Sequence, residues 1–81
     1  MTTYTVDPVL CMALFVSDAP QTYDLDNCTI RDVVARTLEL LGPNECYARA
    51  AEEFGNHPEV ALPRITWARE LCARAMTLTT V

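Results

Sequence analysis

The groups in this chain best suited to chemistry are carboxylates, one histidine and four cysteines, and their spacing decides what each could do. The stretch Asp24-Leu25-Asp26-Asn27 alternates carboxylates, which are ligands that calcium prefers. The glycine and the distal glutamate of an EF-hand loop do not follow it. We therefore interpret this stretch as a solvated acidic loop.

Catalytic arrangements are equally weak. The sole histidine, His57, precedes a proline beside Glu59, without a nucleophile or a metal partner. Glu52 and Glu53 are adjacent on a predicted helix and so point in different directions, which is poor geometry for paired carboxylates. Two glycines are few for a phosphate-binding loop. The sequence thus predicts a protein that is not an enzyme.

The cysteines favour structural thiols over a metal site. They stand at wide intervals with no C-x-x-C pair, so we expect neither a bound metal nor a cofactor: Cys11, Cys28, Cys46 and Cys72. Each lies in an apolar stretch, where a reduced thiol acts as a small hydrophobe, and this favours a cytoplasmic protein. A secreted scaffold with two disulfides is the alternative. The apolar run 9–16 has neither a basic n-region nor a cleavage pattern, so we expect no signal peptide or membrane span.

Negative charge is concentrated in the first half of the chain. Residues 1–43 carry six carboxylates but only two arginines, whereas the rest is nearly balanced. An acidic surface repels nucleic acid and anionic lipid and attracts basic protein surfaces. We therefore expect no direct nucleic-acid or membrane partner. The net charge of −5 is also compatible with a role in solubility alone.

The elements that must position these groups are predicted to be helices within one small domain, residues 1–81. Asp7 and Pro8 form a good helix start. The apolar run 9–16 fits a helix or a buried strand, and we favour the helix because no second strand of that length is available. The Thr-rich ends, residues 2–6 and 77–81, favour extended structure or a minor two-stranded pairing.

Turn-forming residues divide the rest of the chain into a loop and three further helices. Residues 17–27 form the acidic loop, and Thr29 with Asp32 resembles a capping box at the start of a second helix. Gly42 and Pro43 should end that helix. Asn44 should cap a third, which Gly55 stops, and Pro63 should begin a fourth. The predicted fold is an all-α, compact bundle of about four short helices. Its inner faces are Ile30, Val33, Val34, Leu38 and Leu41, then Tyr47, Ala50, Ala51 and Phe54, then Ile65, Ala68, Leu71, Cys72 and Ala75.

Two features of the second half of the chain suggest alternative functions, a DNA-binding regulator and a homo-oligomeric scaffold. Residues 47–55, YARAAEEFG, resemble the first helix and turn of a helix-turn-helix DNA-binding unit, in which Arg64 and Arg69 would face phosphate. A cationic face is missing, because residues 44–81 hold five glutamates against four arginines. Trp67, at the edge of the fourth apolar stripe, suits either the core or an interface. In a homo-oligomeric scaffold it would meet residues 9–16 across a symmetric dimer.

These features predict a small acidic interaction module that docks on a basic surface of a larger protein. Blocking a nucleic-acid-binding site by competition would make it an inhibitor and a nucleic-acid mimic. Inhibitors encoded by phages or mobile elements, and antitoxin-like proteins, share this small, acidic character. The predicted contact residues are four carboxylates and an aromatic ring suited to arginine: Asp18, Tyr23, Asp24, Asp26 and Asp32.

Overall fold

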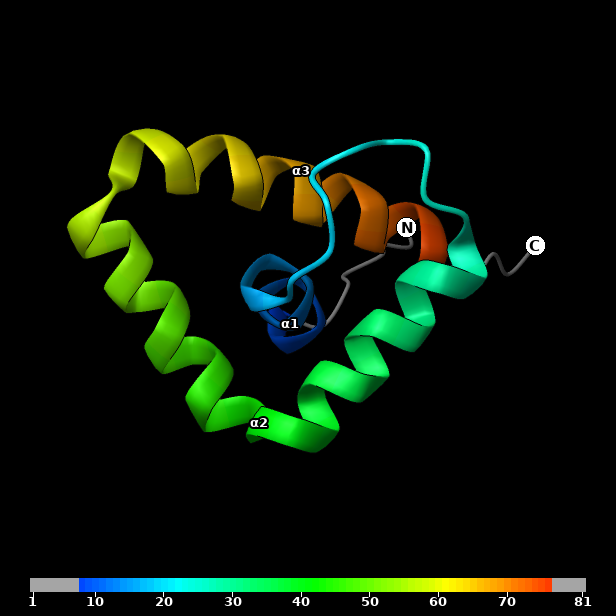
Figure 1. The fold of residues 1–81 in the computed structure, drawn as a ribbon, viewed down its shortest axis with the longest axis horizontal. Helices are drawn as coiled ribbons and strands as arrows, with labels where there is room; N and C mark the ends of the chain where they lie inside the picture. The colour runs from blue at the N-terminus through cyan, green and yellow to red at the C-terminus, as the bar shows by residue number, and fades with distance from the viewer. Residues whose placement is uncertain (1–7, 77–81) are drawn as a thin grey trace, which may run out of the picture.

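The computed structural model describes residues 8–76, which form three helices (Figure 1). They are α1 (Pro8–Val16), α2 (Asn27–Asn56) and α3 (Pro58–Met76). The predicted all-α class is confirmed, with three helices in this range where about four were expected. The proposed cap Asp7 and the Thr-rich ends, with their minor β pairing, lie outside the described residues.

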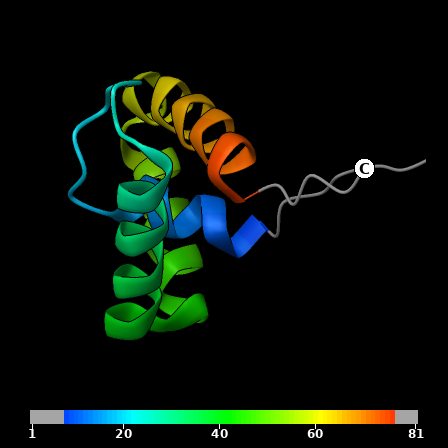
Figure 2. The same ribbon diagram turned by 90° about the vertical axis from the view of Figure 1, so that its right-hand side faces the viewer.

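Helix α1 lies at the centre of the fold. It has nine residues and no charged side chain, and it packs against both other helices. Figure 1 views it nearly end-on, with α2 below and α3 above, and Figure 2 shows it crossing between them. Cys11, Ala13, Leu14 and Phe15 are buried. The helical interpretation of residues 9–16 is therefore confirmed, since an element enclosed on several sides needs no polar face.

Helix α2 is bent at Gly42 and does not end there. Gly42 has φ 82° and ψ 161°, which divides the helix into a first arm (27–41) and a second arm (43–56). Pro43 begins the second arm, where a missing N–H costs little. The break was predicted at the right residue. A second helical arm does follow Gly42, as predicted, but Asn44 lies inside that arm and does not cap it, because the arm begins at Pro43.

Substitution of the two glycines should have opposite effects. Only glycine readily adopts the backbone angles of Gly42, so Gly42→Ala should lower the free energy of unfolding by about 1–3 kcal/mol. No neighbouring atom lies within 4 Å of a Cβ at either glycine. Gly55 is helical, and Gly55→Ala should therefore raise stability by up to about 1 kcal/mol. Urea unfolding followed by circular dichroism measures both, and equal midpoints would contradict the prediction.

Helix α3 begins at Pro58, five residues earlier than predicted. A single residue, His57, joins it to α2: the His57 N–H donates to the Glu53 carbonyl, and the His57 carbonyl accepts from Val60 and Ala61. The expected start, Pro63, lies inside the helix. Pro63 cannot donate to the carbonyl of Glu59 four residues back. Glu59 is exposed in the first turn, so the loss is tolerated there.

The core confirms most of the predicted inner faces. All five positions in α3 are buried, and on the first arm Ile30 and Val34 are buried. The second arm is rotated from the prediction: Tyr47 and Ala51 are exposed, while Cys46, Ala50 and Phe54 face inwards. The Phe54 ring stacks on Phe15 with centroids 5.5 Å apart. Trp67 is a core residue, only 1% exposed.

Candidate interaction surface

The acidic loop, defined here as residues 17–26, lies across α3 and is bonded to it (Figure 1). The Trp67 indole Nε1 donates to the Thr22 carbonyl at 2.8 Å. One turn further along α3, the Tyr23 hydroxyl donates to the Glu70 carboxylate, which raises the pKa of Tyr23. This loop lacks regular structure, yet side chains at helical spacing on α3 fix its course.

Arg74 fixes the far end of the acidic loop. Its Nε donates to Asn27 Oδ1 at 2.9 Å, and its terminal nitrogens donate to the carbonyls of Tyr23 and Leu25. Glu70 and Arg74 have the i, i+4 spacing that predicts an ion pair on a helix, but this pair is not formed. Both side chains reach across to the loop instead: Arg74 donates to backbone carbonyls, and Glu70 accepts from the Tyr23 hydroxyl. These bonds replace a weak local ion pair.

Arg64 holds the near end of the loop and caps α1. Its Nε donates to the Phe15 carbonyl at 2.7 Å, and one terminal nitrogen donates to the Ser17 and Ala19 carbonyls at 2.8 and 3.1 Å. The carbonyls of a helix's last turn lack partners within the helix and attract a cation. The guanidinium also lies 4.7 Å from the centroid of the Trp67 ring, and its partial burial lowers the pKa of Arg64.

The five predicted contact residues are exposed, but they do not share one role. Asp18 and Asp24 are in the acidic loop and Asp32 is on α2, and none of these three carboxylates has a hydrogen bond or ion pair within residues 8–76. Asp26 is the N-cap of α2 and accepts from the Thr29 N–H at 2.7 Å, a bond that lowers the pKa of its carboxyl. The cap assigned to Thr29 and Asp32 therefore belongs to Asp26. Tyr23 is 56% exposed although its hydroxyl is bonded.

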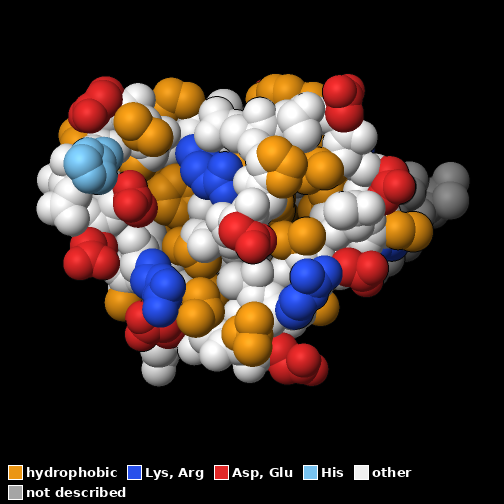
Figure 3. Space-filling model, viewed as in Figure 1, with side chains coloured by type: hydrophobic (Ala, Val, Ile, Leu, Met, Phe, Trp, Pro, Cys, Tyr) orange, Lys and Arg blue, Asp and Glu red, His pale blue; other side chains and the backbone are white. Residues whose placement is uncertain are grey.

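Charge is spread over the surface. On the face shown in Figure 3, carboxylates are scattered from the centre to the edge, with arginines between them. The arginines are not equivalent, because Arg64 and Arg74 donate to oxygens that are not carboxylates. The described residues contain one ion pair, between Arg49 and Glu45 on the second arm, at 2.9 Å. Most exposed carboxylates in residues 8–76 therefore have no bonded cation.

Each of the two alternative functions needs side chains on the surface that the structure shows to be engaged or buried. A helix-turn-helix unit would aim Arg64 at phosphate, but its guanidinium is engaged with three carbonyls of the same chain. The turn itself is reduced to His57. A scaffold joined through residues 9–16 and Trp67 would need both surfaces outside, whereas Trp67 and most of α1 are buried within one chain. Neither arrangement gains an observation in its favour.

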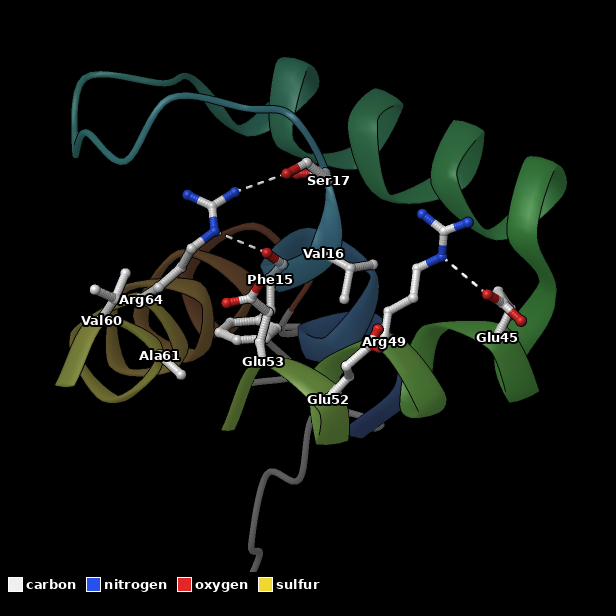
Figure 4. A pocket seen from close by; sticks show the side chains of 10 residues that line it. All are labelled: Phe15, Val16, Ser17, Glu45, Arg49, Glu52, Glu53, Val60, Ala61 and Arg64. Carbon is white, nitrogen blue, oxygen red and sulfur yellow. Dashed lines mark hydrogen bonds and ion pairs between the residues drawn. The ribbon is translucent and has the colours of Figure 1, made fainter. Parts of the chain in front are cut away.

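A surface that the sequence did not indicate lies beside the C-terminal end of α1. A cavity of about 510 Å³ opens between the second arm and the start of α3 (Figure 4). Glu52 and Glu53, which helical spacing directs apart, both line it. A second groove of about 330 Å³ runs from Asp18 to Leu40 on the other side of the α1 end.

Residues 8–76 contain neither a metal-binding cluster nor a helix that could span a membrane. No group of three or more histidine, cysteine, aspartate or glutamate side chains within residues 8–76 could hold a metal ion. No helix in this part of the chain is long and apolar enough to cross a membrane. Of the cysteines, Cys11, Cys46 and Cys72 are buried, whereas Cys28 is exposed, contrary to the apolar setting predicted for it.

No protein-family model, no curated protein and no solved structure matches this chain. Its function must therefore be inferred from its own surface.

Proposed function

We propose that this protein is a non-enzymatic interaction module whose acidic loop docks on a basic surface of a larger protein. Asp18, Asp24 and Asp32 supply negative charge, and the exposed Tyr23 ring supplies a face for arginine. Asp26 contributes chiefly by starting α2. Occupying a basic nucleic-acid-binding surface would inhibit the partner by steric and electrostatic competition.

The observation that best supports this proposal is the fixation of the acidic loop on α3. Bonds from Arg64, Trp67 and Arg74, with the bond from Tyr23 to Glu70, span the loop from end to end. A loop ordered before binding loses less conformational entropy when it meets a partner. Exposed carboxylates on that loop would also steer a basic partner during encounter.

Reversing loop charges should weaken partner capture without unfolding the protein. The variant Asp18→Arg with Asp24→Arg should bind the partner about 10- to 100-fold more weakly, because like charges facing each other cost several kcal/mol. Neither carboxylate bonds within residues 8–76, so helicity should persist. The measurement is affinity capture from a lysate of the source organism at low and moderate salt, followed by mass spectrometry and by binding titration of the purified partner.

The matched control is Glu39→Arg with Glu59→Arg, which changes the net charge equally on exposed helical positions. It should retain capture. Asp26 is left unchanged because its loss would remove the α2 cap. An equal loss in both variants would reduce the effect to net charge and overturn the site assignment. If the captured partner binds nucleic acid, adding this protein should displace that nucleic acid, and failure to do so would overturn the inhibitory mechanism.

A further inference from the structure

The cavity beside the end of α1 combines an apolar floor with a charged rim (Figure 4). Phe15 and Val16 from α1 and Val60 and Ala61 from α3 form the apolar part. Val60 is 57% exposed, a large apolar side chain left uncovered at the cavity edge. Phe15 and Ala61 are already buried, so Val60 and the partly buried Val16 supply the apolar surface that a ligand would remove from water.

The charges around the rim do not cancel. Arg49 is paired with Glu45, and both side chains are about half exposed, at 53% and 50%. Arg64 is engaged with the backbone of α1 and the acidic loop. Glu52 and Glu53 remain, and neither side chain has a hydrogen bond or ion pair in the described part of the chain. The three carboxylates and two arginines that line the cavity leave it with a net charge of −1, and neither Glu52 nor Glu53 is bonded to a cation.

We propose that this cavity receives an arginine side chain of the basic partner. The aliphatic stem would cover Val16 and Val60, while the guanidinium would lie between the carboxylates of Glu52 and Glu53. Arginine suits this arrangement because its planar fork bonds two carboxylates at once and its stem packs on apolar surface. This proposal rests on the proposed function for the basic character of the partner, yet it uses residues outside the acidic loop.

A short peptide tests the cavity without the partner. Acetyl-Gly-Arg-Gly-amide is titrated into the ¹⁵N-labelled full chain at low salt, with the citrulline peptide as a neutral control of the same shape. We expect the amide signals of Glu52, Glu53 and Val60 to shift at about millimolar peptide. The citrulline peptide should shift them at least about tenfold less, since it lacks the charge that strengthens these hydrogen bonds.

Two variants locate the binding. Glu52→Gln with Glu53→Gln should abolish the shifts, whereas Glu39→Gln with Glu59→Gln, an equal change outside the cavity, should retain them. Shifts of equal size with the citrulline peptide, shifts confined to the acidic loop, or no shifts at all would overturn the proposal. Peptide binding that persists when the partner is not captured would overturn the proposed function alone. If the partner is captured but the amide signals of the cavity residues do not shift with the arginine peptide, this proposal alone would be overturned.

Discussion

Replacing Trp67 with alanine is expected to lower the free energy of unfolding by about 3–5 kcal/mol. The side chain is 1% exposed and packs in the core, and its indole nitrogen holds Thr22. Domains of this size have a total stability of about 4–12 kcal/mol. The variant should therefore lose a large share of its stability, and thermal and urea unfolding followed by far-ultraviolet circular dichroism should show clearly lower midpoints.

The conservative variant separates packing from the hydrogen bond. Trp67→Phe keeps most of the apolar contact but leaves the Thr22 carbonyl without its donor, so we expect a smaller loss of about 1–2 kcal/mol. Its acidic loop should exchange amide hydrogens faster than in the native protein. A Trp67→Ala variant as stable as the native protein would contradict the position of this residue in the core.

The Arg64→Ala variant is expected to lose about 3 kcal/mol of unfolding free energy. Three carbonyls, those of Phe15, Ser17 and Ala19, would lose a charged donor where the chain leaves α1. Hydrogen bonds to a charged group contribute about 1.5–3 kcal/mol each, and water entering the site would recover part of the loss. Urea unfolding midpoints provide the measurement.

Arg64→Lys tests whether geometry or charge matters at this position. Lysine retains the cation, but a single ammonium cannot reach all three carbonyls as the planar guanidinium does. Its stability should therefore fall between those of Arg64→Ala and the native protein. If lysine restored full stability, the effect would be one of charge near the α1 terminus alone. If alanine were harmless, the capping role of Arg64 would be wrong.

Local signals in the sequence predicted the parts of the fold that depend on local physics. The apolar run after Pro8, the periodic stripe of α3 and the break at Gly42 each follow from a few neighbouring residues. The predictions were wrong where two nearby residues could each give the same signal. Pro63 looks like a helix start, but an earlier proline, Pro58, already begins α3.

The candidate interaction surface was less predictable because tertiary contacts define it. Glu70 and Arg74 have the spacing of a helical ion pair, yet their partners are loop residues about fifty positions away in sequence. The role of Asp26 as a cap became clear only when the start of α2 was fixed. The cavity lined by Glu52 and Glu53 needs three helices to form, so no sequence window contains its signal.

The enclosure of α1 has a consequence during translation. Sixty residues separate the end of α1 at Val16 from the end of α3 at Met76. At about 5–20 residues per second, a ribosome takes roughly 3–12 s to add them. Until α3 is complete, the most apolar of the three helices can pack only against α2, and the side of it that α3 covers stays open. Chaperones that bind exposed apolar segments should therefore engage this protein early, and chains truncated before α3 should aggregate.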